Sequence, residues 1–149
     1  ESASNESRQV RKVIDETAAR QGRTVHLKVI LETGLLVTPE NIAEASFLAM
    51  EAGADFIKTS TGKVEVNATP LAAYIMCECI AKFYEKTHRR VGFKPAGGMA
   101  TAADTLCYYS IASFVLGKDW LNKDLLRFGV SRVANSILSA VERRTVSFF

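Results

Sequence analysis

Apolar residues recur along the chain with two different spacings, one typical of helices and one typical of strands. Ile42, Ala45 and Ala49, for example, repeat at three and four residues, the spacing of one helix face. This spacing predicts helices at residues 10–21, 38–53, 69–84, 101–117 and 131–141. Short runs rich in β-branched and aromatic residues predict strands at residues 25–31, 54–58, 90–94 and 125–128.

The residues at the predicted helix starts support these boundaries. A threonine followed by proline occurs at residues 38–39 and again at 69–70, which is typical of an N-cap and a first-turn proline. Thr101 and Asp104 have the spacing of a capping box, and Ser131 is the expected cap of the last helix.

Strands and helices alternate, and the predicted strands begin near residues 25, 54, 90 and 125. This alternation predicts an α/β fold with a parallel sheet and right-handed crossovers. Two architectures fit: a four-stranded doubly wound sheet, or part of a (β/α)8 barrel. A complete barrel of such units needs roughly 260 residues, close to the usual size of that fold, and this chain holds four units.

Composition and charge argue against a nucleic-acid-binding protein and against a membrane-spanning one. The chain is 48% hydrophobic, and its net charge of +3 is too small to indicate a nucleic-acid partner. No apolar run is long enough to span a membrane. The three cysteines lie outside any metal-binding spacing, which favours a reducing, cytoplasmic compartment. The whole chain is expected to be one unit, with residues 1–9 a polar tail or loop and residues 143–149 a C-terminal tail.

Three neighbouring predicted strands each carry a lysine at or toward the carboxyl end, namely Lys28, Lys58 and Lys94. Functional sites of parallel α/β proteins lie at this end. A lysine close to other cations loses its proton more easily, and the neutral amine can form a Schiff base with a carbonyl. The alternative is that each lysine simply reaches solvent from the end of its strand.

The loops after the last three predicted strands resemble phosphate sites. Thr61, Gly62 and Lys63 follow the second strand, and Gly97 and Gly98 follow the third. The fourth is followed by Gly129 and Ser131, just before a helix. Glycine lets backbone N–H groups approach an anion, and a helix N-terminus adds a favourable dipole. Each glycine alone is also typical of an ordinary turn, but together they predict a phosphorylated carbonyl substrate.

Five short segments carry a resemblance to one enzyme family. They are KVILETG at residues 28–34, FIKTSTGK at 56–63, VNAT at 66–69, GFKPAGG at 92–98 and RFG at 127–129. These segments resemble deoxyribose-phosphate aldolase, and the resemblance runs from about residue 10 to residue 142.

The resemblance implies a class I aldolase on a (β/α)8 barrel, which reversibly cleaves 2-deoxyribose 5-phosphate to acetaldehyde and glyceraldehyde 3-phosphate. It implies no metal or organic cofactor. By position, Lys58 would be the Schiff-base lysine, Lys94 the lysine that perturbs it and relays protons, and Lys28 a residue lining the site. The expected substrate-binding residues in the loops are Thr61, Gly62, Lys63, Gly97, Gly98, Gly129 and Ser131.

The sequence also departs from the family. No residue corresponds to the family's acidic catalytic group on an earlier strand, so the chain resembles the C-terminal half, strands 5 to 8, and its expected partner is the N-terminal half of the same barrel. Ala100 and Arg132 replace polar residues of the phosphate region, and the chain ends in Phe148 and Phe149 with no tyrosine. These departures leave two alternatives: a binding or scaffold module with lost activity, and a Schiff-base aldolase for another phosphorylated carbonyl. The oligomeric state stays open, with a homo-oligomer one expectation.

Overall fold

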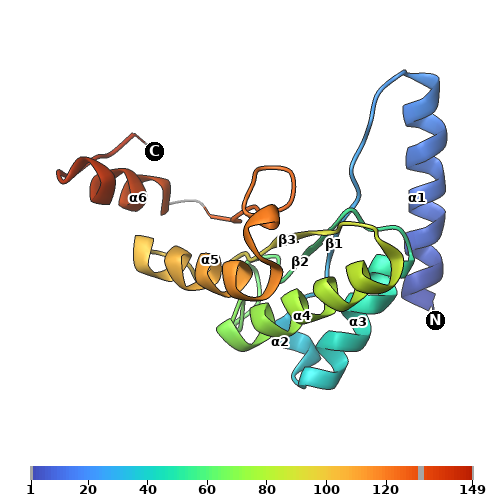
Figure 1. The fold of residues 1–149 in the computed structure, drawn as a ribbon, viewed down its shortest axis with the longest axis horizontal. Coiled ribbons are helices and arrows are strands. Elements are labelled where there is room, and N and C mark those ends of the chain that lie inside the picture. The colour runs from blue at the N-terminus through green and yellow to red at the C-terminus, as the bar shows by residue number, and fades with distance from the viewer. Residues whose placement is uncertain (1, 131–132, 149) are drawn as a thin grey trace.

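The computed structural model describes residues 2–130 and 133–148, in which helices alternate with strands (Figure 1). The helices are α1 (Ser2–Arg20), α2 (Thr33–Leu36), α3 (Pro39–Glu51), α4 (Pro70–Thr87), α5 (Ala102–Leu116) and α6 (Val133–Glu142). The strands are β1 (Lys28–Ile30), β2 (Phe56–Lys58) and β3 (Gly92–Lys94), and a 3-10 turn, η1, spans Lys118–Trp120. The predicted α/β class is confirmed.

The three strands form a parallel sheet in the order β1-β2-β3. The predicted fourth strand, residues 125–128, is present as isolated bridges that join Leu126 to Phe93 and Gly129 to Ala96. Its backbone is hydrogen-bonded to Phe93 on both sides, and the Gly129 N–H donates to the carbonyl of Pro95. Proline has no N–H to donate in return, so the ladder is interrupted at Pro95 and the segment pairs without becoming a continuous strand.

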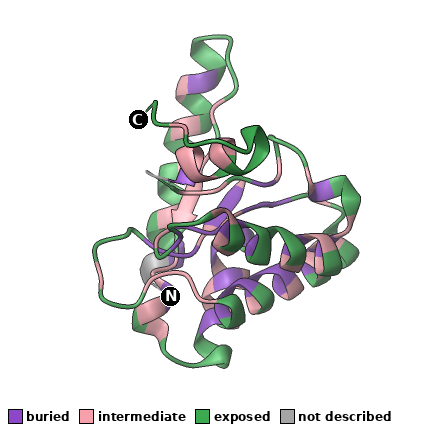
Figure 2. Cartoon of the chain, turned by 90° about the vertical axis from the view of Figure 1, so that its left-hand side faces the viewer, coloured by how far each residue is buried: buried purple, intermediate pink, exposed green. Residues whose placement is uncertain are grey.

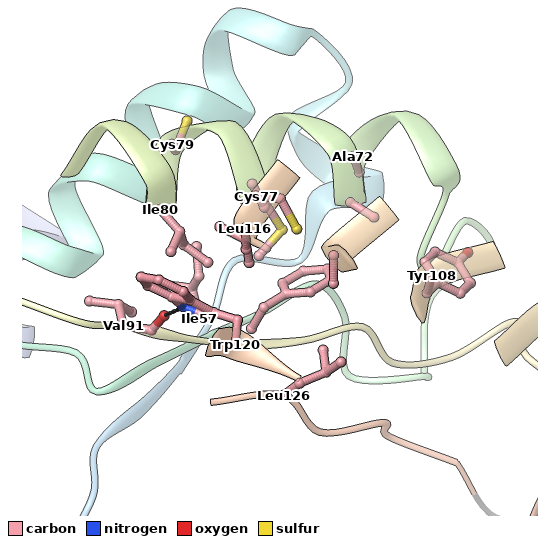
Figure 3. Packing of buried hydrophobic residues seen from close by; sticks show 14 of the residues in the cluster. Ile57, Ala72, Cys77, Cys79, Ile80, Val91, Tyr108, Leu116, Trp120 and Leu126 are labelled. Atoms are coloured by element: carbon pink, nitrogen blue, oxygen red, sulfur yellow. Dashed lines mark hydrogen bonds between the residues drawn. The ribbon is translucent and has the colours of Figure 1, made fainter. Parts of the chain in front are cut away.

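Helices α3, α4 and α5 lie side by side on one face of the sheet (Figure 1). Val29, Ile57 and Phe93 face these helices from the centres of the three strands, and the last two are fully buried. Figure 3 shows part of this core, in which Trp120 lies beside Ile57 and donates its indole N–H to the carbonyl of Val91. Along the covering helices, buried positions alternate with exposed ones (Figure 2). The hydrophobic core therefore lies between the sheet and one helix layer.

The predicted starts of three helices are confirmed. The threonine side chain at each N-cap accepts a backbone N–H from the first turn, and the caps are Thr38 of α3, Thr69 of α4 and Thr101 of α5. At Thr101 the Asp104 carboxylate also accepts the N–H of the cap residue, which completes the predicted capping box. The predicted cap of the last helix, Ser131, lies outside the described residues.

The N-terminal segment and two short helical elements also differ from the expectation. Residues 2–9 were expected to form a tail or loop, but α1 begins at Ser2. This segment contains no glycine or proline to stop a helix, and the side chain of Ser4 is buried. The short helix α2 and the turn η1 were not predicted, because neither is long enough to show a periodic pattern. Within the described part of the chain, no helix is both long and apolar enough to cross a membrane.

Candidate active site

The parallel register places the predicted lysines on one face of the sheet. Lys58 of β2 lies directly opposite Lys94 of β3, and Lys28 of β1 lies opposite Phe56, two residues before Lys58 and therefore on the same face. Paired residues of neighbouring strands point to the same side, and this side is opposite the α3–α5 layer. All three lysines are partly buried. The structure thus brings together the three lysines that the sequence singled out.

The Phe56 ring lies on the same face of the sheet as the three lysines, which we call the lysine face. The Phe56 side chain is buried over Gly92, where a Cβ atom would lie only 2.2 Å from the ring. Glycine on β3 is therefore needed for the ring to occupy its place. The Lys28 amine lies 5.8 Å from the ring centroid and the Arg127 guanidinium 4.7 Å from it, both within the range of cation–π attraction.

The surroundings lower the pKa of both paired lysines. For Lys58 the main cause is burial, followed by the positive charge of Lys94, while Glu32 acts in the opposite direction. The pKa of Lys94 is lowered by burial and then by Lys28 and Arg127. Both effects favour the neutral amine, which is the nucleophilic form. In its neutral form, a lysine at this position can attack a carbonyl carbon.

Thr59 ties the loops at the carboxyl ends of the strands together. Its hydroxyl accepts the N–H of Ala96 at 2.9 Å and donates to the carbonyl of the same residue at 3.2 Å. Its own N–H donates to the carbonyl of Lys94. On the other side, the N–H of Gly97 donates to the carbonyl of Gly129. The loops after β2 and β3 and the segment at residues 125–129 therefore meet around the two paired lysines.

The predicted phosphate residues occupy different positions in these loops. Thr61, Gly62 and Lys63 are exposed in the loop after β2. Gly97 has a left-handed φ of +80°, and a Cβ there would lie 2.6 Å from the amide oxygen of Asn67. The neighbouring Gly98 is exposed, also with a left-handed backbone. At Gly97, both the left-handed backbone and the close approach of Asn67 require glycine.

Gly129 is packed against the lysine itself. A Cβ at this position would lie 3.1 Å from Cε of Lys94 and 2.5 Å from Cβ of Ala96. Gly129 therefore makes room for the Lys94 side chain, a structural role that the sequence reasoning did not anticipate. The remaining predicted phosphate residue, Ser131, lies outside the described residues.

Two charged residues at the site were missed. Glu32 lies two residues after the end of β1 and acts on Lys58. Arg127 lies over Phe56 and acts on Lys94. A signal existed for each of them. Glu32 belongs to the 28–34 segment, and Arg127 is two residues before Gly129, on the same side of the fourth predicted strand.

A cavity of about 700 Å³ lies at the opposite, amino-terminal ends of the strands. Asp55, which lines it, accepts the N–H of Leu27 and a guanidinium N–H of Arg11, each at 2.7 Å. These bonds fix α1 and the start of β1 to the start of β2, so the cluster has a structural role. Within residues 2–130 and 133–148, no group of three His, Cys, Asp or Glu side chains is placed to hold a metal ion.

Comparison with known proteins identifies the family. Residues 2–109 match the DeoC/LacD family of aldolases, and the chain belongs to this family. The resemblance seen in the sequence is confirmed by relatives named deoxyribose-phosphate aldolase. The Mus musculus protein is 50% identical over 119 residues, which cover 80% of this chain and 36% of that protein. The Homo sapiens protein is 46% identical over 140 residues, which cover 94% of this chain and 40% of that protein.

A solved structure shares the fold. The deoxyribose phosphate aldolase from Aeropyrum pernix, described as tetrameric, superposes with a TM-score of 0.63 at 21% identity, covering 94% of this chain and 49% of that one. The chain thus spans about two fifths of the length of the two curated relatives and about half of this structure.

Replacing Lys94 tests whether its positive charge lowers the pKa of Lys58. In Lys94→Met the positive charge beside Lys58 is lost, so the pKa of Lys58 should rise. Competitive labelling with acetic anhydride, read by peptide mass spectrometry, should then show Lys58 reacting at higher pH than in the unchanged protein. Lys86→Met, which removes an exposed lysine from the last turn of α4, is the matched control and should leave the Lys58 profile in place. An identical profile in the Lys94 variant would contradict the coupling.

Proposed function

We propose that this chain carries the Schiff-base half of a class I aldolase that reversibly cleaves 2-deoxyribose 5-phosphate to acetaldehyde and glyceraldehyde 3-phosphate. The observation that carries the proposal is the pairing of Lys58 with Lys94 on one open face of the sheet. The family and the names of its relatives support the reaction class and the substrate.

The proposed reaction begins when the neutral amine of Lys58 adds to the C1 aldehyde of the open-chain sugar. Loss of water gives a protonated imine, which withdraws electrons from the neighbouring C2–C3 bond. Removal of the C3 hydroxyl proton breaks that bond, releases glyceraldehyde 3-phosphate and leaves an enamine on Lys58. Protonation at C2 and hydrolysis then release acetaldehyde and restore the amine. Lys94, opposite Lys58, is the proposed group that perturbs its pKa and moves protons.

The fold of the proposed enzyme is a (β/α)8 barrel, of which this chain supplies strands 5 to 8. The helices α3, α4 and α5 cover only one face of the sheet, as they do on the outside of a barrel. The lysine face would then point into the barrel interior. Among the described strands, β1 has a neighbour on one side only, so the N-terminal half of the same barrel is the proposed partner. We use the term completed barrel for this chain joined to, or mixed with, that half.

Substrate phosphate is proposed to bind at the loops that follow β2, β3 and residues 125–129. Lys28 is proposed to line the sugar site, next to the paired lysines. Ala100 has no charged side chain to offer the phosphate, and its N–H already donates to Asp104 at the start of α5. The proposed cation for the phosphate is therefore Lys63, which is exposed in the loop after β2. The three free cysteines support a reducing compartment, the cytoplasm.

Trapping the covalent intermediate tests the proposed chemistry. Borohydride added to the completed barrel with acetaldehyde should reduce the imine and add the mass of one ethyl group at Lys58. Lys58→Leu should abolish both the adduct and turnover, because the electron sink is lost. Lys94→Leu should lower kcat by roughly 10²- to 10⁴-fold, the usual contribution of a proton-transfer group. Peptide mass spectrometry and a coupled assay for glyceraldehyde 3-phosphate measure these effects.

The same experiment separates the alternatives. A stoichiometric adduct at Lys94 with Lys58 unmodified would overturn the assignment of roles. Absence of any adduct would favour the binding or scaffold module. An adduct with other carbonyl donors, without cleavage of 2-deoxyribose 5-phosphate, would favour an aldolase for another phosphorylated substrate.

Removing the charge of Lys63 tests the phosphate site. The side chain is exposed, and it is the backbone N–H of Lys63 that donates to the Thr61 hydroxyl, so Lys63→Met should leave the fold intact. We expect KM for 2-deoxyribose 5-phosphate to rise roughly 10- to 100-fold, which corresponds to the loss of one charge-assisted contact. KM for unphosphorylated 2-deoxyribose should change little. Equal changes for the two sugars would exclude Lys63 from the phosphate site.

The isolated chain tests the half-barrel proposal. An unpaired edge at β1 and an open lysine face leave residues 1–149 without the burial that parallel sheets need. The chain alone is therefore expected to be inactive, and either to self-associate through its edges or to require the N-terminal half. Gel filtration and the cleavage assay, with and without that half added, measure this. A stable, monomeric and active 149-residue chain would contradict the proposal and favour a compact four-stranded fold.

A further inference from the structure

Glu32 is placed beside Lys58 by backbone hydrogen bonds on both sides of it. The N–H of Leu31 donates to the carbonyl of Lys58 at 2.9 Å, and the N–H of Thr33 donates to the carbonyl of Thr59 at 3.0 Å. Glu32 lies between these two donors, so its position along β2 is fixed. Its own backbone is left-handed, with φ of +54° and ψ of +58°, a conformation that non-glycine residues rarely adopt.

The side chain of Glu32 is bound to the loop that follows β2. Its two carboxylate oxygens each accept the N–H of Thr61 at 3.2 Å, and one of them accepts the Thr61 hydroxyl at 2.5 Å. The same hydroxyl accepts the N–H of Lys63 at 3.2 Å. One carboxylate therefore holds the loop that carries Thr61, Gly62 and Lys63. A left-handed backbone at a charged residue is costly and is kept only where its surroundings impose it.

The same carboxylate adds a negative charge on the Lys58 side of the lysine pair. The charged groups that act on Lys58 are Lys94 from β3 and Glu32 from the β1 loop. Lys94 is in turn faced by Lys28 from β1 and Arg127 from the last bridge segment, both cations. Glu32 therefore makes the two lysines of the pair electrostatically unequal.

We infer that Glu32 is a positioning residue that couples the two parts of the site: its carboxylate holds the Thr61–Lys63 loop in place and puts a negative charge at the carboxyl end of β2, where Lys58 lies. The inference rests on the proposed function, since it assigns the loop to substrate phosphate and Lys58 to the carbonyl. The carboxylate itself does not react.

Two variants separate the two effects. Glu32→Gln keeps an oxygen that accepts from Thr61 but removes the charge, whereas Glu32→Ala removes both. Glu65→Gln is the matched control, because Glu65 is an exposed carboxylate two residues after Lys63. In the completed barrel, competitive labelling with acetic anhydride should show Lys58 reacting at lower pH in Glu32→Gln, since the loss of a carboxylate destabilises the ammonium. Glu65→Gln should leave the profile unchanged, with Lys86 as the internal reference.

The cleavage assay tests whether the Glu32 carboxylate holds the Thr61–Lys63 loop in place for substrate binding. Glu32→Ala should raise KM for 2-deoxyribose 5-phosphate roughly 3- to 10-fold over Glu32→Gln, the cost of one neutral hydrogen bond or slightly more. An unmoved labelling profile of Lys58 in Glu32→Gln, or an equal movement in Glu65→Gln, would overturn the electrostatic role. Equal KM values in the Ala and Gln variants would overturn the loop role.

The labelling arm needs no turnover, so failure of the proposed function can be told apart from failure of this inference. An unchanged protein that does not cleave 2-deoxyribose 5-phosphate would overturn the proposed function. The labelling profile of Glu32→Gln would still decide whether the carboxylate acts on Lys58.

Discussion

The parallel register that sets Lys58 opposite Lys94 is the constraint from which the other features of the site follow. Neighbouring strands lie about 4.8 Å apart, and like charges on directly opposite residues repel each other. The position of the pair at the carboxyl ends of β2 and β3 leaves both amines only partly buried. Burial and the charge of Lys94 both lower the pKa of Lys58, and burial, Lys28 and Arg127 lower the pKa of Lys94.

Small residues make this arrangement possible. Gly92 leaves room for the Phe56 ring, and Gly129 leaves room for the Lys94 side chain. Behind the sheet, Ile57 and Phe93 are fully buried against the helices, which keeps the two strands in register. The chemistry on one face therefore depends on close packing on the other, because a shift of one residue would turn the lysines toward the helix layer.

The sequence was sufficient for features that depend on local chemistry. The capped helix starts were predicted because Thr38, Thr69 and Thr101 act on their own first turns. The three strands were predicted from their short runs of β-branched and aromatic residues. The helix at residues 2–9 was missed because polar residues show no apolar period. The role of Glu32 was missed because it depends on a left-handed backbone and on bonds to a loop about thirty residues away. The 28–34 segment singled out the stretch that holds Glu32, but its role follows only from the strand register and the loop contacts.

Charge on the lysine face bears on how the proposed barrel would close. Lys28, Lys58, Lys94 and Arg127 all act on this region, and among the described residues Glu32 is the carboxylate that acts on the pair. Two copies of this chain that closed face to face would bring these cations together, and like charges at short range disfavour such an interface. The resemblance implies an acidic catalytic group on an earlier strand, which would instead offset part of this charge. Electrostatics therefore disfavours a face-to-face dimer of this chain and favours a partner that presents carboxylates to the lysine face.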